Sequence, residues 1–220
     1  MNGEVRVVED VPQAYATLVA EAFLARRNSP FVLCTSGGSS GRAVLGAAAA
    51  STSIDWGKVA LCFVDERCVA PDSADANQQN AREALGDAWA RLAGVYPMSC
   101  EAGAEAYEAE LRSLGPIDLC QLGMGPDGHT ASLFPNSTAL SAPPGRLVVP
   151  NVDPSGVNAH PRLTLTYEAI SGARLVVITV TGDNKAAALA AIEAGADLPA
   201  ARVRAPRLVW LIDAAVRNGG

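Results

Sequence analysis

Apolar runs of four to six residues recur along the chain, separated by polar turns and by segments with a helical repeat. Runs of this length, apolar at nearly every position, are typical of strands buried on both faces of a parallel sheet. The clearest span residues 31–34, 59–64, 117–122, 175–180 and 207–212. Shorter ones are expected at 5–8, 95–98, 147–149 and 163–166. The pattern predicts a sheet built mainly from parallel strands.

Helical patterns fill the intervals between these runs. Asp10 can cap the first helix and Pro12 suits its first turn, so a helix is expected through Arg27, ended by 28–30. Further helices are expected at 42–50, 78–92, 102–114 and 186–194, and Asp213 can cap a last one. This alternation predicts an α/β fold: an open, mainly parallel, Rossmann-like sheet with helices on both faces. Without repeats or low-complexity linkers, one domain spanning residues 1–220 is expected.

Polar groups suited to chemistry follow four predicted strands, at residues 36–40, 65–67, 127–129 and 181–185. The carboxyl ends of parallel strands share one edge of a sheet, where ligands bind in open α/β folds. The glycine-rich loop at 35–41 precedes a helix, so its backbone N–H groups and the helix dipole suit a phosphate. A turn without a ligand is the alternative. The loop is not a Walker motif, because no Gly-Lys-Ser/Thr ends it.

The stretch at 123–134, GMGPDGHTASLF, carries the densest set of candidate groups. It follows an apolar run, which predicts a strand, a tight loop and the start of a helix. Its glycines permit positive φ and close approach to a ligand. Asp127 and His129 place a carboxylate near an imidazole on a constrained turn, which can hold His129 as a general base. The alternatives are a capping or core role for His129 and helix capping for Asp127.

Composition narrows the possible partners. The formal net charge of −6 disfavours nucleic acid and anionic membranes, so an anionic substrate would need a local basic pocket. Neither a signal sequence nor an apolar run of about 18 residues is present, and a cytoplasmic protein is expected. Five scattered cysteines argue against a disulfide framework, so reduced thiols are expected. With His129 and His160 as the two histidines, a transition-metal site is not expected.

Four blocks, in order, resemble the 6-phosphogluconolactonase family of the glucosamine/galactosamine-6-phosphate isomerase-like superfamily, over nearly the whole chain. They are Ser36-Gly-Gly-Ser39; Asp55-Trp56 with Phe63-Val-Asp-Glu-Arg67 and Asn77; the segment 123–135; and Arg162-Leu-Thr-Leu-Thr166 with Thr181-Gly-x-x-Lys185. One departure is Ser40, which stands where the family more usually has threonine.

The resemblance implies hydrolysis of 6-phospho-D-glucono-1,5-lactone to 6-phospho-D-gluconate in the oxidative pentose phosphate pathway, without organic cofactor or metal. It implies that His129 is the general base, and Asp127 can orient it or stabilise its protonated form. The residues expected to bind the phosphorylated substrate are Gly37, Gly38, Ser39, Arg67, Arg162 and Lys185. The division of roles among the three cations stays open, as does closure of loops 137–146 and 151–161. The expected partner is a small phosphosugar lactone, bound by a monomer or weak homo-oligomer.

Two other functions stay open from the sequence. A phosphosugar isomerase–deaminase, similar to glucosamine-6-phosphate deaminase, shares the Gly-x-Asp-Gly-His turn but continues towards Phe-Asn-Glu-Pro and usually has tyrosine in place of Arg67. Here 132–135 reads Ser-Leu-Phe-Pro, which lacks that acid. A non-catalytic phosphosugar sensor is the second, and the pair Asp127 and His129 argues against it. Each cation also has a plain alternative as a surface charge, with Glu66 or Asp65 as a partner for Arg67.

Overall fold

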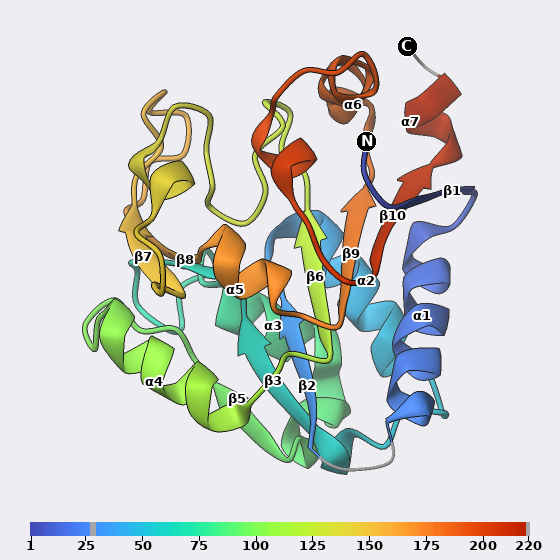
Figure 1. Cartoon of the computed structure of the whole chain (residues 1–220). Coiled ribbons are helices and arrows are strands. Elements are labelled where there is room, and N and C mark those ends of the chain that lie inside the picture. Colours follow the sequence, from blue (N-terminus) through green and yellow to red (C-terminus); the bar gives the residue numbers. More distant parts are fainter. Residues whose placement is uncertain (27–29, 219–220) are drawn as a thin grey trace.

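The computed structural model describes residues 1–26 and 30–218, and within them a seven-stranded sheet has the order β1-β10-β9-β6-β2-β3-β5 (Figure 1). Every neighbouring pair is parallel. The strands are β1 (Glu4–Val8), β2 (Phe31–Thr35), β3 (Val59–Phe63), β5 (Gly94–Tyr96), β6 (Leu119–Gly123), β9 (Leu175–Val180) and β10 (Leu208–Asp213). The predicted α/β class with a mainly parallel sheet is therefore confirmed.

Helices cover both faces of this sheet. One face packs against α1 (Val11–Ala25), α2 (Gly38–Ala49) and α3 (Asn77–Leu85). The other packs against α4 (Ala104–Leu114), α5 (Tyr167–Ser171), α6 (Ala186–Glu193) and α7 (Ala214–Asn218). Along β2, Leu33 belongs to the first apolar cluster, and Val32 and Cys34 belong to the second. Such central strands are apolar at nearly every position because both of their faces are buried.

The strand order reverses beside β2. The chain passes from β2 to β3 and β5 on one side, and then returns to β6 on the other side of β2. Crossovers on the two sides of such a point diverge, which leaves a crevice at the carboxyl ends of the two strands. The residues that follow β2 and β6 are the glycine-rich loop and the stretch that begins at Gly123. The topology thus places the two most distinctive loops of the sequence side by side.

A second, antiparallel sheet lies beyond the end of β3. It contains β4 (Asp65–Arg67), β8 (Arg162–Leu165) and β7 (Val148–Asn151) in the order β4-β8-β7. Residues 65–67, expected as polar groups at the exit of the strand at 59–64, themselves form a short strand that pairs with β8, and Arg67 lies opposite Arg162. This sheet brings a segment from late in the chain to the rim of the main sheet.

Several helix boundaries differ from the prediction. The helix expected at 42–50 begins at Gly38, so the glycine-rich segment forms its first turn. The helix expected at 78–92 ends at Leu85, because Gly86 adopts φ +52° and a 3₁₀ segment follows. Asp10 caps α1 as predicted and accepts a hydrogen bond from the N–H of Gln13 at 2.9 Å. The expected end of that helix, at 27–29, lies outside the described residues.

The helix start expected after His129 is absent: the described residues 124–137 contain turns and an isolated bridge between Thr130 and Leu133. Ala131 adopts φ +49°, which is a left-handed backbone conformation, so a right-handed α-helix cannot run through this residue. The hydroxyl of Ser132 donates to Asp65 at 2.5 Å, and Leu133 is fully buried. Tertiary contacts therefore override the local helical preference of Thr-Ala-Ser-Leu.

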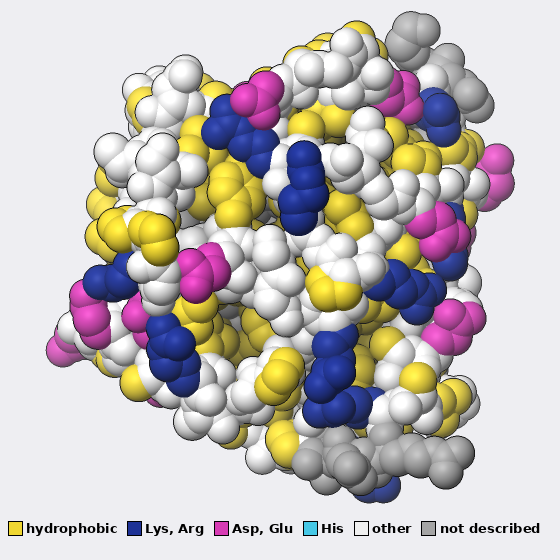
Figure 2. Space-filling view, in the orientation of Figure 1, with side chains coloured by type: hydrophobic (Ala, Val, Ile, Leu, Met, Phe, Trp, Pro, Cys, Tyr) yellow, Lys and Arg dark blue, Asp and Glu magenta, His cyan; other side chains and the backbone are white. Residues whose placement is uncertain are grey.

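The outer surface shows mixed charge. In Figure 2, Lys and Arg side chains lie in separate groups among acidic and neutral ones, and no continuous basic band crosses this face. Among the described residues, no helix combines the length and the apolar character needed to cross a membrane.

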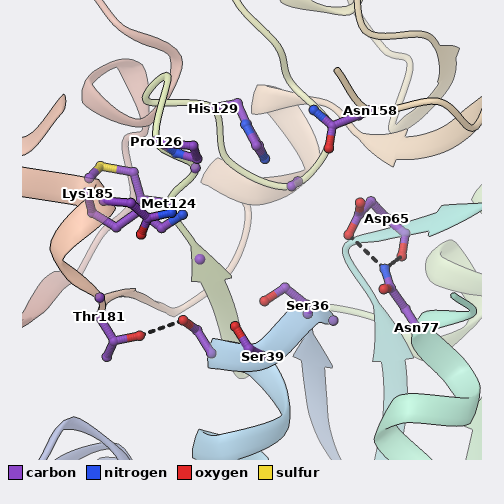
Figure 3. A pocket seen from close by; sticks show the side chains of 18 of the residues that line it. Ser36, Ser39, Asp65, Asn77, Met124, Pro126, His129, Asn158, Thr181 and Lys185 are labelled. Carbon is purple, nitrogen blue, oxygen red and sulfur yellow. Dashed lines mark hydrogen bonds between the residues drawn. The ribbon is translucent and has the colours of Figure 1, made fainter. Parts of the chain in front are cut away.

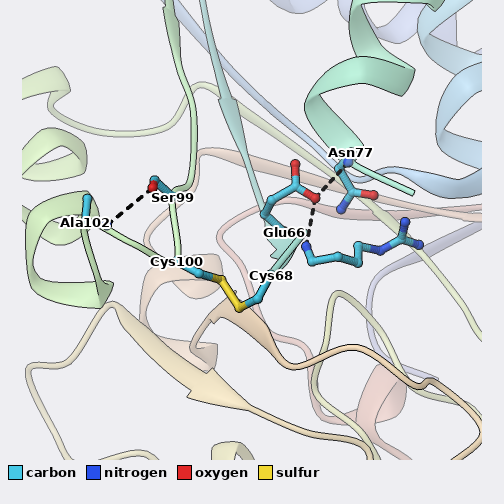
Figure 4. The surroundings of a disulfide bond; sticks show 7 residues. Glu66, Cys68, Asn77, Ser99, Cys100 and Ala102 are labelled. Atoms are coloured by element: carbon cyan, nitrogen blue, oxygen red, sulfur yellow. Dashed lines mark hydrogen bonds between the residues drawn. A yellow bond between two sulfur atoms is a disulfide. The ribbon is translucent and has the colours of Figure 1, made fainter. Parts of the chain in front are cut away.

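Cys68 and Cys100 form a disulfide (Figure 4), which corrects the expectation of five reduced thiols. Cys68 directly follows β4, and Cys100 lies between β5 and α4. They stand 32 positions apart in sequence, but their Cα atoms are 5.4 Å apart. Because tertiary structure creates this proximity, the sequence spacing did not reveal it. Cys34, Cys62 and Cys120 are buried free thiols, as their apolar surroundings predicted.

We expect reduction of the Cys68–Cys100 disulfide to lower the free energy of unfolding by about 3–4 kcal/mol, because it removes the constraint on a loop of this length in the unfolded chain. Urea unfolding with and without dithiothreitol measures the change. The double variant Cys68→Ser/Cys100→Ser should begin at the lower stability and show no response to the reductant. Identical wild-type curves in the two conditions would contradict the prediction.

Candidate active site

A cavity of about 420 Å³ opens at the carboxyl ends of the central strands (Figure 3). Residues from 36–40, 65–67, 123–131 and 181–185 line it, so all four polar strand exits meet there. Asn77 and Asn158 complete the wall from outside these exits. The convergence predicted from the strand pattern is therefore observed, at the point where the strand order reverses.

The N-terminus of α2 forms one wall and includes Gly37, Gly38 and Ser39. Gly37 has no room for a side chain, because a Cβ there would overlap the amide oxygen of Asn77. Gly38 adopts φ +73°, which favours glycine. The first N–H groups of a helix lack intrahelical partners and carry the positive end of its dipole. This wall is therefore suited to an anion such as a phosphate.

Gln121, fully buried on β6, fixes the start of this wall. Its Oε1 accepts hydrogen bonds from the N–H of Ser36 at 2.9 Å and from the Ser36 hydroxyl at 2.7 Å. Its Nε2 donates to the Thr179 hydroxyl on β9 at 3.1 Å. A further bond of 2.6 Å joins the hydroxyls of Ser40 and Thr181. One buried amide thus ties the exits of β2, β6 and β9 together.

Asp127 and His129 form a hydrogen-bonded pair in the loop after β6. Nδ1 of His129 lies 2.5 Å from Oδ1 of Asp127, which also accepts the backbone N–H of His129 at 3.1 Å. Gly125 must be glycine, because a Cβ there would overlap the imidazole. The ring of His129 packs against Phe134, with centroids 4.9 Å apart. Nδ1 is therefore occupied, and Nε2 is the free nitrogen of a ring that points into the cavity (Figure 3).

The charge of Asp127 is stabilised within this pair. Partial burial acts to raise the pKa of its carboxyl. The hydrogen bond and charge of His129, together with backbone N–H groups, outweigh burial and hold that pKa below its usual value. The Asp127 carboxylate is therefore ionised at neutral pH. An ionised partner on Nδ1 orients the ring and stabilises its protonated form.

Two cations line the cavity, Lys185 and Arg67. Burial lowers the pKa of the Lys185 ammonium group, and the charge of Asp127 offsets part of this shift. The guanidinium of Arg67 donates to the backbone carbonyl of Asp75. Among the described residues, neither cation forms an ion pair with a carboxylate. Their charge is therefore available to an anionic ligand.

Glu66 is not the partner of Arg67 that the sequence left open. Its carboxylate accepts the backbone N–H groups of Arg67, Asn77 and Gln78 at 2.7, 2.7 and 2.9 Å, and so caps α3. Burial raises the pKa of this carboxyl, although the three hydrogen bonds act against the shift. Glu66 therefore positions a wall of the cavity and does not cancel its positive charge.

Arg162 lies outside the cavity lining, unlike the other predicted binding residues. Its side chain is 7% exposed and lies 3.6 Å from Asp65, a carboxylate that does line the cavity. Asp65 also accepts hydrogen bonds from Ser132 at 2.5 Å and from the Asn77 side chain at 3.1 Å. Six of the eight predicted residues thus line the cavity, Asp127 contacts it through its hydrogen bond to His129, and Arg162 lies behind the wall.

Sequence reasoning missed three residues that shape this site: Gln121, Ser132 and Asn158. Gln121 gave one signal, as a polar residue inside an apolar run. Ser132 gave none, because its partner Asp65 lies 67 positions away in the chain. Asn158 gave none either: its partners Asp153 and Arg162 are near in sequence, but its place in the cavity wall depends on the folded loop. Such contacts become visible only once the two sheets are assembled.

Known proteins resemble the chain over most of its length. The family model for glucosamine-6-phosphate isomerases/6-phosphogluconolactonase matches residues 5–210. A protein of Pseudomonas putida named 6-phosphogluconolactonase is 40% identical over 165 residues, or 71% of this chain and 67% of the relative. Its namesake from Rhizobium meliloti is 32% identical over 222 residues, 93% and 94% of the two chains. The crystal structure of 6-phosphogluconolactonase from Thermotoga maritima has a TM-score of 0.79 at 29% identity, covering 96% of this chain and 100% of that one. The chain belongs to the family of glucosamine-6-phosphate isomerases and 6-phosphogluconolactonases.

Proposed function

We propose that this chain hydrolyses 6-phospho-D-glucono-1,5-lactone to 6-phospho-D-gluconate in the oxidative pentose phosphate pathway. The relatives named 6-phosphogluconolactonase support this, and one geometric observation carries it. Asp127 holds Nδ1 of His129, which leaves Nε2 free on a cavity whose other wall is the N-terminus of α2. A base and an anion site on one cavity suit a substrate with an ester at one end and a phosphate at the other.

The phosphate end of the substrate is assigned to the wall formed by Gly37, Gly38 and Ser39. Backbone N–H groups there provide donors in fixed directions, and the helix dipole adds a positive potential. Lys185 and Arg67 supply full positive charges beside this wall. Because burial already lowers the hydration of Lys185, its charge interacts more strongly with a bound anion than a solvated ammonium would.

The ester end is assigned to His129. Nε2 takes a proton from a water molecule while the water oxygen bonds to the lactone carbonyl carbon. The carbonyl oxygen then carries the negative charge, which Lys185 or Arg67, whichever does not hold the phosphate, stabilises. When the carbonyl re-forms, the bond to the ring oxygen breaks, and the imidazolium returns its proton to that oxygen. Throughout this cycle Asp127 stabilises the imidazolium from the Nδ1 side.

The isomerase–deaminase alternative has less support at this site. Residues 132–135 supply no carboxylate, and the hydroxyl of Ser132 is bonded to Asp65. The proposal keeps one domain over residues 1–220, a small phosphosugar lactone as partner, a cytoplasmic monomer or weak homo-oligomer, and no requirement for metal or organic cofactor. A cytoplasmic location would require the Cys68–Cys100 disulfide to persist in a reducing compartment.

Replacing His129 with Gln is expected to lower kcat by roughly 10²–10⁴-fold with a small change in KM, because a general base acts in the transition state. The rate of lactone hydrolysis above the spontaneous rate measures the effect. His160→Gln, at the half-exposed second histidine, is the matched control and should retain wild-type activity. An unchanged rate in His129→Gln would refute the assignment, and ammonia release from glucosamine 6-phosphate would favour the deaminase.

Replacing Lys185 with Ala is expected to raise KM for the phosphorylated lactone at least about tenfold, since charge-assisted hydrogen bonds contribute about 1.5–3 kcal/mol. Unphosphorylated glucono-1,5-lactone should be much less affected. The matched control is Lys58→Ala, because Lys58 is the chain's other lysine and pairs with Asp55 away from the cavity. Equal losses on the two lactones would argue against a phosphate contact.

A further inference from the structure

Arg162 occupies an unusual place for a cation in a substrate site. It lies on β8, opposite Arg67 of β4, with its guanidinium behind the cavity wall and 7% of its side chain exposed. Burial lowers the pKa of this group; the charge of Asp65 opposes the shift and that of Arg67 adds to it. A charge buried at this depth costs free energy unless its surroundings satisfy it. Its contacts should therefore reveal what it does.

The guanidinium joins three separate segments of the wall. Nη1 lies 3.4 Å from the Ser132 hydroxyl and 3.6 Å from Asp65, and Nη2 lies 3.4 Å from the amide oxygen of Asn158. Cζ lies 5.4 Å from the ring centroid of Phe134, within range of a cation–π interaction. The two hydrogen bonds are long, at 3.4 Å, and the contact with Asp65 is an ion pair beyond hydrogen-bond range. Asp65 supplies the opposing charge, and the guanidinium fills the space where the three segments meet.

The contact with Phe134 leads directly to the proposed base. Phe134 is fully buried, and its ring centroid lies 4.9 Å from that of His129. Asp127 fixes Nδ1 of the imidazole, but a single hydrogen bond leaves the ring free to tilt about that nitrogen. The Phe134 ring limits this tilt, and Arg162 in turn limits the position of Phe134. Ser132, two residues before Phe134, is held by the same guanidinium and by Asp65.

Given the proposed lactone hydrolysis, we propose that Arg162 is a positioning residue that fixes the direction of His129 through Phe134 and the 129–134 turn, and is not a phosphate ligand. The free Nε2 of the imidazole must meet a water molecule at a defined angle to the lactone carbonyl. Misplacement of a reacting group by about 1 Å can cost 10²-fold in rate. Loss of the guanidinium should therefore reduce the rate of the chemical step without weakening the grip on the phosphate.

The test compares Arg162→Lys, Phe134→Leu and their double variant in steady-state kinetics on phosphorylated and unphosphorylated lactone. Arg162→Lys keeps the charge but loses the planar group that spans the three segments. We expect kcat to fall roughly 10- to 100-fold on both lactones alike, with KM within about threefold of wild type. Phe134→Leu should lower kcat in the same way. The double variant should lose little more than the worse single variant, because both changes break one chain of contacts.

The control is Arg174→Lys at an arginine that pairs with Asp118 at the opposite end of the sheet, and it should retain wild-type kinetics. A selective rise of KM for the phosphorylated lactone in Arg162→Lys would overturn the inference in favour of phosphate binding. Independent, multiplicative losses in the double variant would also overturn it. If Arg162→Lys does not fold, as thermal unfolding would show, unchanged kcat in Phe134→Leu still refutes the proposed route. The wild-type assay tests the proposed function separately. If the wild type does not hydrolyse the lactone, the proposed function is refuted, and the positioning role that rests on it is refuted with it.

Discussion

The hydrogen bonds of one buried amide hold the two halves of this site together. Gln121 lies on β6, and its Oε1 accepts both donors of Ser36 at the exit of β2. These two strands flank the point where the strand order reverses, so their loops are neighbours in space but 85 positions apart in sequence. An unsatisfied buried amide costs about 1–3 kcal/mol, so the loops cannot separate without penalty. The distance between the anion wall and His129 is fixed by the core of the sheet.

Behind the cavity, buried polar groups replace what would otherwise be apolar packing. Asp65 bonds Ser132 and Asn77, and Arg162 lies between Asp65, Ser132 and Asn158. Low polarity strengthens such interactions, and it makes any unpaired member costly. The geometry of the group is therefore more sharply defined than that of an aliphatic core, which tolerates repacking. The small antiparallel sheet supplies this stiffness to a loop, 124–137, that forms no helix of its own.

The sequence predicted what depends on local pattern and missed what depends on assembly. Central strands such as β9 were recognisable because burial on both faces leaves mostly apolar side chains, and parallel pairing then places their exits at one edge. The turn around Ala131 was wrongly predicted as a helix start. Its left-handed backbone results from contacts to β4 and β8, which the local sequence does not reveal. The Cys68–Cys100 pair and the burial of Arg162 were hidden for the same reason. From the sequence Arg162 was predicted to bind the substrate, and only the structure shows that its buried side chain lies beside Asp65, outside the cavity lining.

A chain with a net charge of −6 must still attract a phosphorylated ligand, and the partners of its acidic residues explain how. Asp65 is compensated by Arg162, Glu66 by three backbone N–H groups, and Asp127 by His129. Each of these three carboxylates is thereby engaged with a donor of the protein itself. The N-terminus of α2, Arg67 and Lys185 then set the local potential, because their positive charges face the cavity and neither side chain forms an ion pair within the described part of the chain. Local pairing, and not overall composition, decides which ligand the cavity accepts.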